Sequence, residues 1–327
     1  MRSFAHFNAA TVDEAVSVLR RYGGKATVIA GGTDVLGRMK DEILPAYPEA
    51  LVNIKTIPGL DFIDEIDGVI IIGALTRLED IALNRAVQAS CPALAEAARR
   101  TASTHLREMG TIGGNICQDV RCWYYRNPDN RFSCLKKGGG RCYAINGDNR
   151  YHSIFGGSVD QGCYAVHVSD MAPALVALDA AIKTSRREVR AEEFFKVGML
   201  RTTILDDDEI VTEIKIPKPV GWSAFFKFAL RKAIDFPIVN CAAMMALAEG
   251  KVTEARICLN AVHGTPYRAR KAEEVMIGVS INEDTAEAAG SAAISAAIPL
   301  TKNGYMVQIA KTMVKRAILA CNCPDKL

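Results

Sequence analysis

The sequence predicts an α+β protein, in which a larger N-terminal part built of strand–loop–helix units precedes a smaller part of antiparallel strands and helices. In the first part, "KATVIA" runs through "GGTD" into "VLGRMKDEIL", which is a strand, a turn and a helix. In the second part, "SAFFKFAL", "NCAAMMALA" and "VTEARICLNAV" have the pattern of antiparallel strands, with "EGK" as a hairpin turn. The proline-rich "PKPVGW", residues 217–222, separates the two parts and predicts a domain boundary.

Composition restricts the class of protein. The chain has 327 residues, of which 49% are hydrophobic and 24% charged, as is usual for a globular protein of two or three domains. A net charge of +3, spread along the chain, argues against a nucleic-acid partner. No apolar run approaches the roughly 20 residues of a membrane helix, and the N-terminus lacks the apolar core of a signal peptide. We therefore expect a cytoplasmic protein without a membrane span.

Periodicity and capping residues predict further elements. Residues 11–24 form a helix that begins with a capping box of Thr11 and Glu14 and ends at two glycines. Other helices are expected at 77–83, capped by Thr76, and at 92–103. Strands are expected at "ALVNIKTI", "GVIIIGAL" and "DEIVTEIKIPKP", and the chain should end in three helical stretches: 268–278, 285–298 and 305–320.

Two glycine turns have the pattern of phosphate-binding loops. "IAGGTDV", from Ile29 to Val35, leaves a strand through two glycines and enters a helix, so its main-chain N–H groups can surround an anion. "TIGGN", from Thr111 to Asn115, repeats this chemistry, and Cys117 follows as a packing residue. Two such turns fit a ligand with two phosphates, although each alone is also an ordinary tight turn. Neither is a Rossmann G-x-G-x-x-G or a Walker A motif, which disfavours the usual NAD and P-loop domains.

The ten cysteines are unevenly distributed, and their pattern predicts a metal centre. Cys122, Cys134, Cys142 and Cys163 lie in one irregular segment and are separated by eleven, seven and twenty residues. Zinc sites prefer closely spaced cysteine pairs, whereas iron–sulfur clusters accept four thiolates at varied spacing. Basic neighbours should favour the thiolates; they are Arg121, Lys136, Lys137 and Arg141. A basic loop with incidental thiols is the alternative.

The remaining cysteines have simpler interpretations. Cys91, Cys241 and Cys258 lie in apolar surroundings and are predicted to be core residues. Cys321 and Cys323 form a C-x-C near the C-terminus, which we interpret as part of a frayed tail. Lys227 lies on a strand whose basic and apolar residues alternate. Its side chain either reaches a bound anionic ring or belongs to a solvated strand face, and the pattern alone favours the solvated face.

Taken together, these motifs resemble the FAD-binding (medium) subunit of the molybdenum hydroxylases, the family of xanthine dehydrogenase and carbon monoxide dehydrogenase. The resemblance covers essentially the whole chain, and its motifs follow the family's order: "IAGGTDVL", "TIGGNICQ", "SDMAPALVALDA", "DEIVTEIKIP" and "FFKFALRKAIDFPIVNCAA". It implies an FAD domain of two subdomains, as in the vanillyl-alcohol oxidase-like fold, and a smaller α+β domain. The implied ranges are 1–57, 58–218 with a cysteine-rich loop at 117–165, and 219–327.

The resemblance also implies the residues that contact FAD. The first glycine turn would hold the diphosphate, and Lys227 matches a lysine near the flavin ring. The implied contacts are Ile29, Ala30, Gly31, Gly32, Thr33, Asp34, Val35, Ala102, Thr111, Gly114, Asn115, Cys117, Ser169, Asp170, Ile210, Val211 and Lys227.

The cysteine loop distinguishes this sequence from most of the family. Asn115 and Ser169 are separated by 53 residues, where the family ordinarily has a short connection. Two branches resemble this arrangement, the β subunit of 4-hydroxybenzoyl-CoA reductase and the FAD subunit of periplasmic aldehyde oxidoreductase, and both carry an extra [4Fe–4S] cluster there. The resemblance thus implies a [4Fe–4S] cluster on the four cysteines of this loop.

The implied function is electron transfer within a heteromeric oxidoreductase. The implied partners are a large molybdopterin-cofactor subunit, a small [2Fe–2S] subunit and an external carrier such as ferredoxin, and the substrate would bind to the molybdenum subunit rather than to this chain. A reductase of the 4-hydroxybenzoyl-CoA type is expected, with an aldehyde or N-heterocycle oxidoreductase as the alternative. Two other classes stay open, a stand-alone flavin oxidoreductase and a zinc-stabilised binding module.

Overall fold

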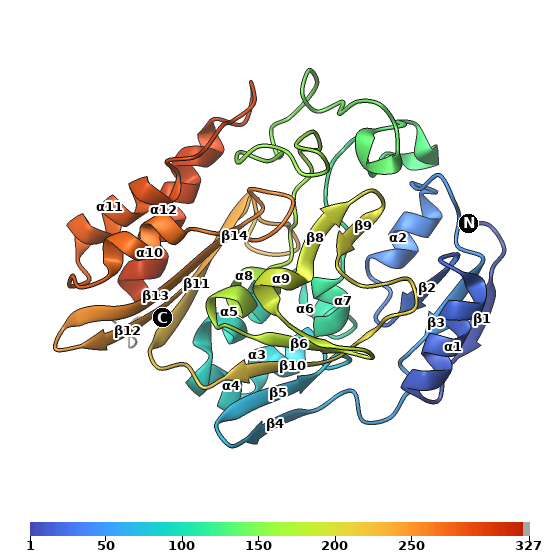
Figure 1. The fold of residues 1–327 in the computed structure, drawn as a ribbon, viewed down its shortest axis with the longest axis horizontal. Helices are drawn as coiled ribbons and strands as arrows, with labels where there is room; N and C mark the ends of the chain where they lie inside the picture. The colour runs from blue at the N-terminus through green and yellow to red at the C-terminus, as the bar shows by residue number, and fades with distance from the viewer. Residues whose placement is uncertain (323–327) are drawn as a thin grey trace.

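The computed structural model describes residues 1–322, and its N-terminal part is a small parallel sheet with two helices (Figure 1). The strand order is β1-β3-β2, and both neighbours of β3 run parallel to it. The elements are β1 (Ala5–Asn8), α1 (Val12–Tyr22), β2 (Ala26–Ile29), α2 (Val35–Lys40) and β3 (Ala50–Asn53). The first glycine turn connects the end of β2 to the start of α2, as the sequence predicts.

The predicted cap of α1 at Thr11 is confirmed, but Glu14 bonds the preceding residue, Ala10, and so does not close the predicted capping box. The Thr11 hydroxyl accepts a hydrogen bond from the Glu14 amide at 3.1 Å, and the Glu14 carboxylate accepts one from the Ala10 amide at 2.7 Å. Gly23 ends the helix with a φ of 52°, a left-handed conformation that glycine adopts without strain. In contrast, the predicted cap at Thr76 is wrong, because the Thr76 hydroxyl donates to the carbonyl of Phe62 instead of capping the next helix.

The central part is a five-stranded antiparallel sheet with helices on one face. The strand order is β4-β5-β10-β6-β7, so β10 returns from a distant part of the sequence to the middle of the sheet. A separate hairpin joins β8 to β9. The strands are β4 (Ile63–Ile66), β5 (Val69–Gly73), β6 (Ala181–Thr184), β7 (Glu188–Arg190), β8 (Phe195–Gly198), β9 (Arg201–Thr203) and β10 (Val211–Pro217). The helices are α3 (Leu78–Leu83), α4 (Arg85–Ser90), α5 (Pro92–Arg100), α6 (Thr104–Arg107), α7 (Ile112–Ile116), α8 (Met171–Ala177) and α9 (Ala191–Phe194).

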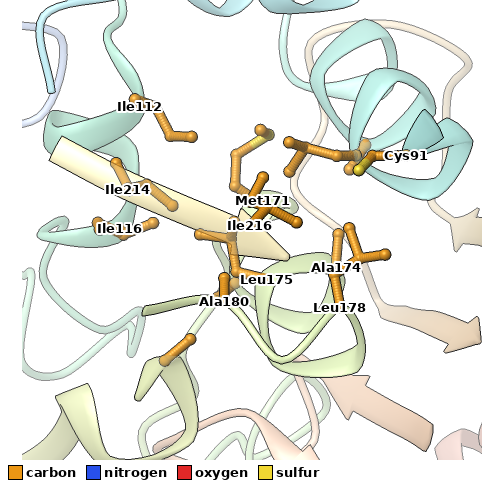
Figure 2. Close-up of a cluster of buried hydrophobic side chains, with 14 of the residues drawn as sticks. Cys91, Ile112, Ile116, Met171, Ala174, Leu175, Leu178, Ala180, Ile214 and Ile216 are labelled. Carbon is orange, nitrogen blue, oxygen red and sulfur yellow. The ribbon is translucent and has the colours of Figure 1, made fainter. Parts of the chain in front are cut away.

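Packing of α7 and α8 against β10 forms the main core of this part (Figure 2). Ile112 and Ile116 of α7, Leu175 of α8 and Ile214 of β10 are all fully buried in one cluster. The predicted core cysteine Cys91 belongs to the same cluster. Because α7 begins at the second glycine turn, this packing fixes the turn relative to the sheet.

The C-terminal part is a four-stranded antiparallel sheet covered by three helices (Figure 1). Its order, β11-β12-β13-β14, follows the sequence, and Glu249 and Gly250 form the predicted hairpin turn. The elements are β11 (Trp222–Phe228), β12 (Val239–Ala248), β13 (Lys251–Asn260), β14 (Tyr267–Arg268), α10 (Arg270–Met276), α11 (Glu283–Ala293) and α12 (Tyr305–Ala320). Cys241 and Cys258 are fully buried here, as predicted.

Cys321 corrects the prediction of a frayed tail. Its thiol is buried against α12 and donates to the carbonyl of Ala317 at 3.2 Å. The helix therefore carries Cys321 into the core, while Cys323 lies outside the described residues.

The cysteine-rich segment 117–165 crosses between the N-terminal part and the C-terminal helices with little regular structure (Figure 1). It contains two single 3₁₀ turns, η1 (Pro128–Asn130) and η2 (Leu135–Lys137). The Asp129 amide donates to the carbonyl of Asp41, just beyond α2, at 2.8 Å, and the Lys302 amide donates to the Asn149 side chain at 2.8 Å. Hydrogen bonds thus attach the middle of this long loop to the N-terminal part and to the segment before α12. Within residues 1–322, no helix is long and apolar enough to cross a bilayer.

The core packing predicts that Leu175→Ala lowers the free energy of unfolding by about 2–5 kcal/mol, because it leaves a cavity between α8 and β10. Urea denaturation followed by fluorescence measures this change. Leu83→Ala, at a side chain that is 65% exposed, is the control and should change the stability by no more than about 0.5 kcal/mol. Equal losses in the two variants would contradict the packing described.

Candidate functional site

A cavity of about 350 Å³ lies where both glycine turns, the strand β11 and the start of the cysteine loop meet. A site of this size and of mainly apolar lining suits a cofactor. It brings together fifteen of the seventeen predicted contacts: Ala30, Gly31, Gly32, Thr33, Asp34, Val35, Ala102, Thr111, Gly114, Asn115, Cys117, Asp170, Ile210, Val211 and Lys227. The other two, Ile29 and Ser169, do not line it. Ile29 packs behind the first turn with Val35, and Ser169 is fully buried.

The first glycine turn lies against the main chain of residues 109–110. A Cβ atom at Gly31 would stand 1.9 Å from the carbonyl oxygen of Met109, so no side chain fits at this position. Gly32 has a φ of 75°, which glycine adopts without the strain of an L side chain. The two glycines therefore serve different purposes, one for close packing of two loops and one for the turn itself.

The second turn is stabilised from within and from behind. The Thr111 hydroxyl accepts a hydrogen bond from the Gly114 amide at 3.1 Å, which caps α7. The Ser169 hydroxyl donates to the Asn115 side chain at 2.5 Å and itself accepts from the Ala172 amide. Ser169 lies just before α8, where its hydroxyl orients the side chain of Asn115 and does not face the cavity.

A buried ion pair lies on the cavity wall formed by β11. The Lys227 ammonium donates to the Asp170 carboxylate at 2.7 Å and to the carbonyl of Arg100 at 2.9 Å, and Asn240 donates to the other carboxylate oxygen at 2.7 Å. Burial raises the pKa of Asp170, and Lys227 opposes that shift. The Lys227 side chain is only 5% exposed, so the interpretation as a solvated strand face is wrong.

Arg38 and Arg121 line the same cavity, and the sequence interpretation missed them as contacts. Each has a buried Nε that finds no hydrogen-bond partner among residues 1–322. Arg121 also lies over the ring of Phe236, 4.2 Å from the centroid. Two guanidinium groups with unused donors, next to glycine turns, match the charge and donor geometry of a diphosphate. The sequence does contain a signal for Arg38, because it follows Asp34 by one helical turn and should therefore lie on the same side of the helix as the glycine turn.

Asp34 connects the first glycine turn to the cysteine loop. Its carboxylate accepts hydrogen bonds from Arg121 at 2.7 Å, from Arg126 at 2.8 Å and from the Asp119 amide at 3.1 Å. Burial acts to raise the pKa of Asp34, but Arg126, Arg121 and Arg38 together hold it below its usual range. Asp34 is therefore an ionised anchor for the cysteine loop.

Asp119 is a second buried carboxylate in the same network. It accepts from the Tyr125 hydroxyl at 2.5 Å and lies 3.5 Å from Arg38 and 3.6 Å from Lys136. Burial acts to raise the pKa of Asp119, but Lys136, Arg38 and Arg126 lower it below its usual range. We call the two carboxylates, their cationic partners and the tyrosine that donates to Asp119 the charge junction. Its members are Asp34, Arg38, Asp119, Arg121, Tyr125, Arg126 and Lys136.

The charge junction corrects the predicted role of one basic residue. Arg121 and Lys136 were both expected to favour the cysteine thiolates; Arg121 pairs with Asp34 instead, whereas Lys136 pairs with Asp119 and also opposes the rise in the pKa of Cys163. Lys136 is fully buried and also donates to the carbonyl of Arg201 at 2.9 Å. Arg141 lies over the ring of Tyr143 at 4.5 Å. Lys137 lies beside the cysteines: its buried Nζ has no hydrogen-bond partner in the described part of the chain, and Cys134 and Cys122 oppose the lowering of its pKa by burial.

Three of the four predicted metal ligands share one buried cluster, next to the charge junction. Cys122, Cys134 and Cys163 lie together with Tyr125, and Cys142 is half-buried beside them. Burial raises the pKa of Cys122 to about 12 and that of Cys163 to about 11. Main-chain N–H groups that face the sulfurs oppose this rise; they belong to Tyr124 and Tyr125 at Cys122, Lys136 and Lys137 at Cys134, and Ala165 at Cys163.

The metal-binding role of the cysteines is not shown by their grouping. Over residues 1–322, no three His, Cys, Asp or Glu side chains are grouped so as to hold a metal ion. This finding supports neither the zinc-stabilised module nor the iron–sulfur cluster considered from the sequence. Whether the four cysteines hold a cluster stays a prediction.

Comparison with known proteins identifies the two halves of the chain. Residues 2–219 match the family model described as "FAD binding domain in molybdopterin dehydrogenase", and residues 224–321 match "CO dehydrogenase flavoprotein C-terminal domain". The aldehyde oxidoreductase FAD-binding subunit PaoB of Escherichia coli is 31% identical over 95% of this chain and 96% of its own length. The carbon monoxide dehydrogenase medium chain of Hydrogenophaga pseudoflava is 29% identical over 97% of this chain and 96% of its own. A solved structure of the carbon monoxide dehydrogenase of that organism superimposes with a TM-score of 0.77 at 28% identity, covering 98% and 97% of the two chains.

The contact between the two loops predicts that Gly31→Ala abolishes FAD binding, because the new Cβ would overlap the Met109 carbonyl and separate the glycine turns. The flavin absorbance per chain of purified protein measures this. Gly37→Ala, where no atom lies within 4 Å of the new Cβ, is the matched control in α2 and should retain full FAD. Normal flavin content in Gly31→Ala would contradict the assignment of the turn.

The charge junction predicts that Asp119→Asn destabilises the protein by about 3–5 kcal/mol, because it leaves the fully buried Lys136 without its carboxylate and Arg38 with Asp34 alone. Because the pKa of Asp119 is lowered in the folded state, its stabilisation is present above about pH 4 and is lost as the pH falls further. Urea denaturation at several pH values checks both statements. Asp207→Asn, which breaks an exposed pair with Arg201, should change the stability little. Equal stability of Asp119→Asn and wild type at neutral pH would show that the junction carries no net stabilisation.

Proposed function

The chain belongs to the family of FAD-binding subunits of the molybdenum hydroxylases, and on that premise we propose that it transfers electrons through FAD and one [4Fe–4S] cluster. As a member of the family it is an oxidoreductase subunit that works with a large molybdenum subunit and a small iron–sulfur subunit. The observation that carries the cluster proposal is the buried cysteine group of the loop 117–165, joined to the FAD cavity by the charge junction.

The residues of the cavity fit FAD. The two glycine turns offer main-chain N–H groups, and the unpartnered Nε groups of Arg38 and Arg121 offer positive charge to the diphosphate. On the β11 wall, the Asp170 carboxylate, which accepts from Asn240, and the Arg100 carbonyl hold the Lys227 ammonium in place, where it can interact with the flavin ring. The chemistry that FAD supplies when bound is conversion between two-electron and one-electron transfer. The chain's own contribution is to fix the ring and to keep the diphosphate dry and neutralised.

The cysteine loop fits an anionic cluster for three reasons. The sulfurs of Cys122, Cys134 and Cys163 are buried in one cluster, so a group bound there would be shielded from water. Main-chain N–H groups face three of them, which stabilises thiolates over thiols. Lys137 is 7% exposed as a residue, and its buried ammonium has no hydrogen-bond partner among the described residues; a buried charge of this kind requires an opposite charge nearby.

Among residues 1–322, no three His, Cys, Asp or Glu side chains are grouped so as to hold a metal ion, so the cluster proposal rests on the buried cysteine group and its main-chain N–H groups. The proposed ligands remain Cys122, Cys134, Cys142 and Cys163, in a loop that belongs to the second FAD subdomain, residues 58–218, next to the C-terminal domain, residues 219–327.

For the physiological reaction, the relatives support a hydroxylase or dehydrogenase of small molecules. PaoB, an aldehyde oxidoreductase subunit, spans 95% of this chain, which favours an aldehyde as the substrate of the molybdenum partner. A reductase of the 4-hydroxybenzoyl-CoA type, expected from the sequence motifs, is the alternative. PaoB and the carbon monoxide dehydrogenase medium chain do not strengthen it. We further propose that the complex works in the cytoplasm and exchanges electrons with an external carrier such as ferredoxin.

The cluster proposal predicts about four irons per chain in anaerobically purified protein, beyond those of any partner subunit. Cys134→Ala should lose this iron while keeping its FAD, because the two sites are formed by different segments. Cys241→Ala, at a buried cysteine of β12, is the control and should keep both. Metal analysis and flavin absorbance on the same samples measure the result. Zinc in place of iron, or equal iron in the two variants, would refute the cluster.

A further inference from the structure

A buried histidine lies directly beside one of the proposed cluster ligands. The His152 ring is in contact with Cys122, with Nε2 at 3.2 Å from the sulfur, and the residue is 1% exposed. The other ring nitrogen, Nδ1, finds no hydrogen-bond partner in the part of the chain that the structure describes. The Cys122 sulfur is therefore the hydrogen-bond partner of the His152 ring.

The position of His152 is fixed from both sides. Its main-chain carbonyl accepts a hydrogen bond from the Asn303 side chain at 2.8 Å, and its amide donates to the Asn149 carbonyl at 3.2 Å. Asn149 in turn accepts from the Lys302 amide, so the segment just before α12 holds this stretch of the cysteine loop. The ring itself lies 6.2 Å from that of Tyr124, which limits its rotation. The C-terminal domain thus places the imidazole at the cysteines.

Resting on the proposed cluster, we infer that His152 is a positioning residue that raises the reduction potential of that cluster through a hydrogen bond from Nε2–H to the Cys122 sulfur. The reduced form of a bound cluster would carry more negative charge on its sulfurs than the oxidised form. A donor aimed at the Cys122 sulfur would therefore stabilise the reduced form more, and hydrogen bonds to sulfur are one of the factors that set cluster potentials. No proton moves in this step; the histidine keeps its proton throughout.

The surroundings strengthen this hydrogen bond. The ring and the sulfur are both buried, so water does not compete for the donor and the local dielectric is low. The Lys137 ammonium acts on the same sulfurs as a charge, whereas His152 acts on Cys122 through a directed bond. Removal of the histidine should therefore lower the cluster potential and leave the flavin, in a separate cavity, unchanged.

The test compares three variants in the complete complex by an anaerobic redox titration followed by electron paramagnetic resonance. His152→Leu and His152→Ala remove the donor, whereas His152→Gln keeps an amide N–H close to the position of Nε2. We expect a lower cluster potential in the Leu and Ala variants, a potential nearer that of wild type in the Gln variant, and the wild-type FAD potential in all three.

The outcomes are distinguishable from those of the cluster proposal itself. Wild-type protein without iron would refute the cluster before any variant is compared. An unchanged cluster potential in whichever of the Leu and Ala variants holds iron would overturn the inference. Loss of iron from all three variants would overturn it as well, because the histidine would then be needed for assembly rather than for the potential.

Discussion

The charge junction is the interaction on which the relation between the two proposed redox sites depends. Asp34, at the start of α2, holds Arg121 and Arg126 of the cysteine loop, and Asp119 holds Arg38 of α2. Each of these charges is buried or half-buried next to an opposite charge, and each would be costly in this place if it were alone. The glycine turn proposed to face the FAD diphosphate and the loop that carries the cysteines are therefore fixed to each other by the same residues.

This construction would let one chain support the two proposed centres without a dedicated domain for the second. The cysteine loop has little regular structure, so its order comes from contacts with the parts of the molecule on either side of it. The charge junction fixes it on the FAD side, while Asn303 and Lys302 fix it on the side of the C-terminal domain. Lys136, fully buried between Asp119 and the carbonyl of Arg201, attaches it to the hairpin β8–β9. Rigid placement of this kind is what electron transfer between two centres requires of a protein.

Much of the fold and the cavity could be predicted because the signals are local. A helix start, a turn and a set of strands were each predicted from nearby residues. These residues are the capping Thr11, the glycines Gly31 and Gly32, and the alternating residues along β11 to β13. The partners of charged residues could not be predicted, because they depend on segments that meet only in the folded chain: Lys227 with Asp170, and Arg121 with Asp34. The same reason explains the errors at Thr76 and Cys321, where a distant carbonyl or a buried helix end decides the environment.

The central claim is that one polypeptide holds a flavin and an iron–sulfur cluster on opposite sides of the charge junction. Crystals of the anaerobically prepared protein, measured on both sides of the iron absorption edge, test it most directly. The account predicts anomalous density for iron among the sulfurs of Cys122, Cys134, Cys142 and Cys163, with flavin density in the cavity beside Asp34. Flavin density without any iron signal at the cysteines would contradict it.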